Sequence, residues 1–245
     1  MRALLSIHDV MPETRPAISA MLTQLFVSVP ELQPQHITLL VVPGRHWCVD
    51  DLAWLRRLAA AGHPLAGHGW DHRARKSRSL FHHLHSLMLS RDAAEHLSRP
   101  SHELMSLILR CHAWFAEHDL PLGPLYVPPA WAVGRLNRTA QQALPFALME
   151  TLSGVVRLTD QFHQRLPLTG YEADNAMRTM FLSASNQFNL ALARRTGSVL
   201  RVGLHPFDLQ NHLAERLICH LQQVTQFCDY SQLLQVEAGT STIPA

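Results

Sequence analysis

The sequence predicts a single α/β domain with a parallel sheet, either open or closed into a barrel of about seven or eight strands. Short apolar runs with the composition of buried strands alternate with helix-like segments along the whole chain. No Gly/Ser-rich linker and no repeat interrupts this alternation. Polar side chains suited to catalysis follow directly after several apolar runs, at the edge where α/β folds build their sites.

The composition is that of an ordinary globular protein and argues against several partners. The 245 residues are 47% hydrophobic and the formal net charge is +2, so neither a nucleic acid nor a membrane is expected as a partner. The N-terminus lacks a signal-peptide pattern and the four cysteines form no Cys-x-x-Cys pair, which favours a cytoplasmic protein with reduced thiols. We expect a domain over residues 1–236 and a flexible tail over 237–245, in an oligomeric state that the sequence leaves open.

The first third of the chain predicts strands separated by helices. The strands have the apolar composition of strands buried on both faces, and they cover residues 3–10, 36–42 and 64–67. Thr14 would cap the first helix, with Pro16 in its first turn. Asp50 or Asp51 would cap the second helix, which ends at Gly62.

The rest of the chain continues the alternation after a basic, histidine-rich excursion at residues 73–90. That excursion is either a lid or substrate wall, or a solvated loop. Further strands are expected at residues 123–131, 146–150, 155–158 and 199–204. Helices are expected at residues 91–118 (interrupted near Pro100), 137–143, 182–196 and 211–227, with a loop from 159 to about 176.

The chemistry of the chain centres on the segment from Ala66 to Arg73, which contains His68 and His72. In an extended strand two residues four apart lie roughly 13 Å from each other, whereas in a helical turn they lie about 6 Å apart. Gly67 and Gly69 allow the chain to bend here, so both imidazoles could reach one metal ion. The alternative is a turn with solvated histidines, because the chain has 17 histidines.

Polar residues at the ends of the other strands complete this pattern. Asp9, His68 and His72 supply one carboxylate and two imidazoles, and three ligands with an open fourth position are typical of catalytic zinc. Asp9 could alternatively cap a turn. His8 and His205 are candidates for proton transfer, since histidine titrates near neutral pH. Adjacent strand residues face opposite sides, so His8 and Asp9 could share a site only if a bulge or turn intervenes.

Four motifs together resemble those of the polysaccharide deacetylases (carbohydrate esterase family 4), and more closely a divergent bacterial deacetylase-like branch. They are Ser6-Ile7-His8-Asp9, His68-x3-His72, Pro128-Pro129-Ala130-Trp131 and Leu204-His205-Pro206. The resemblance covers about residues 3 to 235.

The resemblance implies a distorted (β/α) barrel of about seven strands and hydrolysis of an N-acetyl or related amide on a sugar. It also implies a divalent metal, most commonly Zn²⁺, with Co²⁺, Mn²⁺ or Ni²⁺ as alternatives. By this resemblance, Asp9, His68 and His72 would be the metal ligands and His205 the general acid. Pro129 and Trp131 would form a wall of the substrate groove.

Two departures from the family pattern alter the expected chemistry. His8 occupies the position of the usual aspartate base, and Val127 that of the arginine which orients this base. A neutral histidine base would not need a guanidinium partner. The fourth family motif has only Asp160 as a candidate. We therefore expect a hydrolase for a small N-acylated sugar or glycoconjugate. The alternative is a metal-dependent carbohydrate-binding or regulatory protein on the same scaffold.

Overall fold

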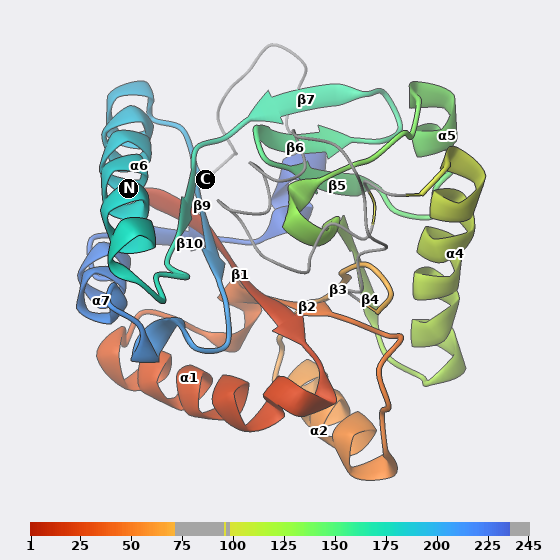
Figure 1. Cartoon of the computed structure of the whole chain (residues 1–245), viewed down its shortest axis with the longest axis horizontal. Helices are drawn as coiled ribbons and strands as arrows, with labels where there is room; N and C mark the ends of the chain where they lie inside the picture. Colours follow the sequence, from red (N-terminus) through yellow and green to blue (C-terminus); the bar gives the residue numbers. More distant parts are fainter. Residues whose placement is uncertain (72–95, 97–98, 236–245) are drawn as a thin grey trace.

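The computed structural model describes residues 1–71, 96 and 99–235, which form one curled sheet with helices around its outer face (Figure 1). The basic stretch 73–90 and the expected tail 237–245 lie outside the described residues. None of the described helices is both long enough and apolar enough to cross a bilayer.

The described residues contain ten strands and six α-helices. The strands are β1 (Arg2–Val10), β2 (Ile37–Val41), β3 (Leu65–Gly67), β4 (Leu122–Tyr126), β5 (Leu148–Thr151), β6 (Gly154–Arg157), β7 (Phe162–Arg165), β8 (Leu168–Gly170), β9 (Leu200–Leu204) and β10 (Gln226–Cys228). The helices are α1 (Arg15–Ser28), α2 (Val49–Ala60), α4 (Ser101–Glu117), α5 (Arg138–Gln142), α6 (Ala176–Thr196) and α7 (Ala214–Leu221).

The sheet has the topology of a distorted (β/α) barrel, as predicted. Its strand order is β7-β6-β5-β4-β3-β2-β1-β9-β8, and β10 pairs with the start of β1. Along this path, seven strands from β5 to β8 are mutually parallel, whereas β6 and β7 form an antiparallel hairpin. Parallel strands end at the same edge, so the residues that follow β1, β3, β4 and β9 are brought together there.

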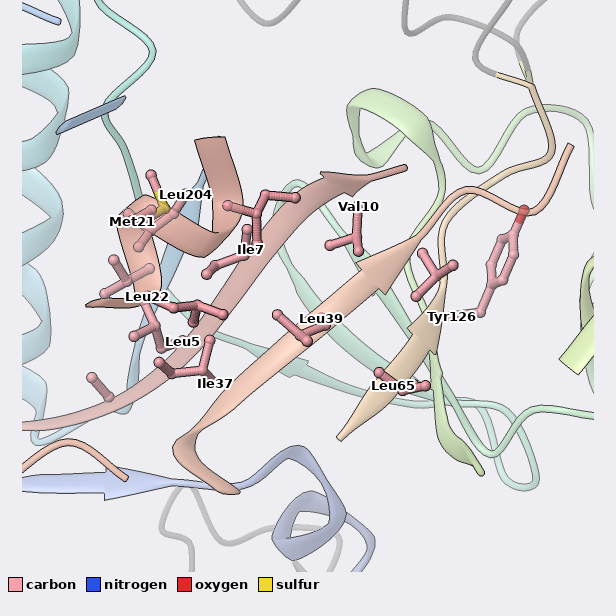
Figure 2. Packing of buried hydrophobic residues seen from close by; sticks show 14 of the residues in the cluster. Leu5, Ile7, Val10, Met21, Leu22, Ile37, Leu39, Leu65, Tyr126 and Leu204 are labelled. Carbon is pink, nitrogen blue, oxygen red and sulfur yellow. The ribbon is translucent and has the colours of Figure 1, made fainter. Parts of the chain in front are cut away.

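Side chains alternate between two cores on the two faces of the sheet. On β1, Leu5 and Ile7 face outward and pack with residues of α1 such as Met21 and Leu22 (Figure 2). Leu4 faces the inside of the curled sheet and belongs to a second, smaller core. Burying each of these aliphatic side chains stabilises the fold by about 2 kcal/mol.

Two segments fold differently from the sequence-based prediction. Residues 159 to 176, expected to form a loop, contain β7 and β8. The sequence does not predict these strands, because β7 has the polar side chains of an edge hairpin and β8 is only three residues long. The expected helix 211–227 ends at Leu221, and β10 follows it to pair with β1. Tertiary strand pairing overrides the helical pattern there.

The helix boundaries also differ in places. α2 is capped by Cys48, and Asp51 instead accepts a hydrogen bond from the Cys48 backbone N–H at 3.3 Å. α6 begins at Ala176, where the Asn175 side chain accepts the Arg178 N–H at 3.0 Å. Gly197 ends α6 in the left-handed conformation, as its position predicts.

Candidate functional site

The end of β1 places His8 and Asp9 at one edge of the barrel. Ile7 and Val10 pair with residues of β2 that are only two apart, so β1 carries one extra residue as a bulge. Asp9 is left-handed, with φ of 54°. Thr14 holds this turn by donating its hydroxyl to the Asp9 carbonyl at 2.5 Å. The bulge removes the strict alternation of the strand, and both side chains reach the same histidine, His68.

His68 follows β3 and faces Asp9. Its Nε2 lies 3.6 Å from Asp9 Oδ1, and its Nδ1 lies 2.7 Å from the backbone oxygen of Val127. A carbonyl can only accept, so Nδ1 carries a proton. In the neutral form of the ring, Nε2 then presents its lone pair on the side of Asp9. This is the arrangement in which histidines bind metals, with the second nitrogen held by a carbonyl. The two residues therefore fit a divalent cation.

His72, the third predicted ligand, lies outside the described residues. Within residues 1–71, 96 and 99–235, no three His, Cys, Asp or Glu side chains form a group suited to a metal. Gly69 adopts φ of 68°, a conformation open to glycine, whereas Gly67 lies within β3.

The His8 ring lies between the His68 and His205 rings. Its centroid is 4.9 Å from that of His68, edge to face, and 4.8 Å from that of His205 in a stacked arrangement. His205 follows β9, and its backbone N–H donates to Asp208 Oδ2 at 2.8 Å. Asp208 is fully buried, and this burial raises the pKa of its carboxyl to about 7, against the opposing effect of His205.

Trp131 closes the inner side of the histidine cluster. Its indole centroid lies 4.8 Å from that of His8. Ala130 and Trp131 both adopt left-handed conformations, with φ of 52° and 53°, in a short turn that begins at Pro129. Residues with a Cβ rarely adopt this conformation, and such strain clusters at functional sites. Pro129 is also buried.

Three buried polar residues beneath the cluster were not predicted from the sequence. Glu150 on β5 accepts the Trp131 indole N–H at 2.8 Å and pairs with Arg201 on β9 at 3.1 Å. Tyr230 is buried beside them, and its pKa is raised well above the ordinary value by burial and by the Glu150 charge. The sequence did hold a signal for this buried group, since Arg201 interrupts an apolar strand.

Asp160, the candidate for the fourth family motif, pairs with Arg157 at the surface, where the guanidinium lowers the pKa of Asp160 to about 2.

A cavity of about 650 Å³ adjoins Trp131. Its walls come from α6, the β5–β6 turn and the segment between β7 and β8, and they include Leu152, Leu166, Phe181 and Asn189. Most of this lining is apolar. Its size is within the range of small-molecule sites in proteins.

Comparison with solved structures identifies the fold. A protein from Mycobacterium smegmatis assigned to the polysaccharide deacetylases superposes with a TM-score of 0.56 at 15% identity, over 100% of this chain and 94% of that one. A family 4 acetyl xylan esterase from Clostridium thermocellum, in complex with a cobalt ion, superposes with a TM-score of 0.51 at 11% identity, over 96% and 91%. No family model and no curated protein sequence matches the chain. The chain thus has the polysaccharide deacetylase fold.

Proposed function

We propose that the chain is a metal-dependent hydrolase that removes an N-acyl group, such as acetyl, from a sugar or related small molecule. The observation that carries this proposal is the meeting of Asp9, His68, His8 and His205 at the carboxyl edge of the barrel strands. The fold shared with deacetylases and acetyl esterases supports the reaction class.

Asp9, His68 and His72 would hold the divalent cation. When bound, the cation would polarise the scissile carbonyl and promote ionisation of the attacking water. Zn²⁺ is our first candidate because it favours nitrogen and oxygen ligands with one open position. Co²⁺, Mn²⁺ and Ni²⁺ are the alternatives, and the cobalt ion in the acetyl xylan esterase supports a divalent cation of this kind.

His8 and His205 would move the protons of the reaction. His8 would take a proton from the attacking water, and His205 would give one to the departing amine. The two rings stack at 4.8 Å, so they can act on neighbouring atoms of one amide. The buried Asp208 carboxyl holds the backbone of His205 and thereby orients it.

Trp131 and Pro129 would form one wall of the substrate site. An indole face suits the apolar face of a sugar ring, and the adjoining cavity offers room for the rest of a small glycoconjugate. We therefore propose a small N-acylated sugar or glycoconjugate as the substrate class.

Metal content and turnover of single variants test this proposal. Purified protein should carry about one divalent ion per chain, and His68→Ala should lose it. His205→Ala should keep the metal and lose turnover by at least about 100-fold. His102→Ala is the matched control, because His102 is an exposed residue in the first turn of α4 and should change neither quantity.

Three outcomes would contradict the proposal or its assignments. A wild-type protein that stays empty in excess Zn²⁺, Co²⁺ and Mn²⁺ would refute the metal site. Loss of metal from His205→Ala would make His205 a ligand and not the general acid. Metal and sugar binding without hydrolysis of any N-acetylated substrate would support the alternative of a binding or regulatory protein.

A further inference from the structure

An ion pair lies buried inside the barrel below the histidine cluster. The exposed fraction is 0% for Arg201 and 1% for Glu150, and Arg201 Nη1 lies 3.1 Å from Glu150 Oε1. The guanidinium also donates to the carbonyls of Thr151, Leu152 and Leu166 at 2.6 to 2.8 Å. Desolvation of both charges offsets most of their attraction, so a buried pair is a weak source of stability. The carbonyl hydrogen bonds give Arg201 a structural role, but the attraction within the pair adds little net stability to it.

The same carboxyl oxygen holds the indole that packs on His8. Glu150 Oε1 accepts the Trp131 Nε1–H at 2.8 Å. Trp131 and the preceding Ala130 are both left-handed, a conformation that persists only when surrounding contacts impose it. The indole hydrogen bond is such a contact, and the indole lies with its centroid 4.8 Å from that of His8.

A second route leads from Glu150 to His8 through two hydroxyl groups. The Tyr230 hydroxyl is near enough to the Glu150 carboxyl and the Ser6 hydroxyl for both to affect its pKa, although it makes no well-aligned hydrogen bond among the described residues. Ser6 Oγ lies 3.5 Å from His8 Nε2. Two of the residues that lie against His8, Trp131 and Ser6, are thus themselves beside Glu150 or its neighbour Tyr230.

We propose that Glu150 and Arg201 are positioning residues for His8. Arg201 orients the Glu150 carboxylate, the carboxylate fixes the Trp131 indole, and the indole fixes the His8 ring between His68 and His205. The kinetic consequence of this arrangement rests on the proposed hydrolase function, whereas its geometric consequence does not.

The test replaces the pair with apolar residues of similar volume, in Glu150→Leu combined with Arg201→Met. Apolar replacement of a buried pair is often tolerated. Here it also removes the donor of the Thr151, Leu152 and Leu166 carbonyls, so a loss of stability is expected as well. We expect the indole N–H proton resonance of Trp131 to shift upfield and the nuclear Overhauser contact between Trp131 and His8 to disappear. Because a displacement of about 1 Å can cost about 100-fold in rate, kcat should fall by about that factor.

A control variant and a double-mutant cycle distinguish a loss of His8 positioning from a general loss of stability. Arg157→Met with Asp160→Leu removes a surface ion pair and should leave both the Trp131 signal and kcat unchanged. Trp131→Phe keeps an aromatic ring but removes the N–H donor, so it should lower kcat similarly. Combining it with the Glu150/Arg201 replacement should cause no further loss.

Several results would overturn the inference. These are an unchanged Trp131–His8 contact in the folded Glu150/Arg201 variant, an unchanged kcat in that variant, or losses that multiply in the combined variant. If that variant fails to fold, Trp131→Phe decides alone, and an unchanged kcat there overturns the proposal. If the wild-type protein hydrolyses nothing, the Trp131–His8 contact still tests the positioning role.

Discussion

At the scale of single residues, Gly203 determines how closely the site packs. It lies on the inward face of β9 between Arg201 and His205, and a Cβ built on it would lie 3.2 Å from both His8 Nε2 and Trp131 Cζ2. An added methyl group must therefore displace one of the two rings.

Gly203→Ala should lower kcat by less than the roughly 100-fold expected of a 1 Å displacement, because it moves His8 or Trp131 by only a few tenths of an ångström. Overpacking should also reduce the free energy of unfolding by about 1–3 kcal/mol. Steady-state kinetics and urea denaturation measure the two effects. Gly170, the strand partner of Gly203, would place a Cβ in open space, so Gly170→Ala should leave stability and the Trp131 resonance almost unchanged.

The sequence predicts the residues at strand ends better than those inside the barrel. His8, Asp9, His68 and His205 follow apolar runs, and parallel strands bring such positions to one edge. Whether Glu150 faces inward depends on the register of β5, which strand pairing sets and the sequence alone does not. From the sequence, a bulge or turn near Asp9 is expected only if His8 and Asp9 share one site.

At the scale of elements, a single side chain joins α6 to the short strand β8. The buried Asn186 amide accepts the Gly170 N–H at 3.2 Å and donates to the Gly170 carbonyl at 2.8 Å. It thus satisfies two backbone groups at the open side of the sheet, where β8 has β9 as its one strand neighbour among the described residues.

Asn186→Ala should lower the free energy of unfolding by about 2 kcal/mol, because two backbone groups lose their partners. Urea denaturation measures this change. Asn189, one turn away on α6, hydrogen-bonds only within its own helix among the described contacts, so Asn189→Ala should change stability by less than about 0.5 kcal/mol. Equal effects of the two variants would show that Asn186 does not hold β8.

The strands with the clearest sequence signal are those buried on both faces. β1, β2, β3 and β9 are mostly apolar, a pattern typical of parallel strands in α/β folds. β7 and β10 escape prediction because the first is a polar hairpin strand and the second follows a helical pattern without a clear break. Their pairing partners stabilise them, and those partners are distant in sequence.

At the scale of the whole molecule, the inner core joins the two sides of the curled sheet. The Arg201 guanidinium on β9 contacts carbonyls of the β5–β6 turn and of the segment between β7 and β8. The same group pairs with Glu150 beneath Trp131. The contacts that hold the barrel together are therefore continuous with those that hold the proposed base, His8.

The stability of the molecule should also depend on pH through Asp208. Burial raises the pKa of this carboxyl to about 7 in the folded state, against an ordinary value of 3.8. Between about pH 4 and 7 the folded chain keeps a proton on Asp208 that the unfolded chain releases, so the contribution of Asp208 to the free energy of unfolding falls as pH rises and levels off above 7. Asp208→Asn keeps an acceptor for the His205 N–H but cannot ionise. Its stability relative to wild type should therefore increase across this range, by up to about 4 kcal/mol. Urea denaturation of both proteins at several pH values, with a chelator present, measures this difference in stability. A difference that does not change with pH would show that Asp208 is ionised in the folded protein throughout this range.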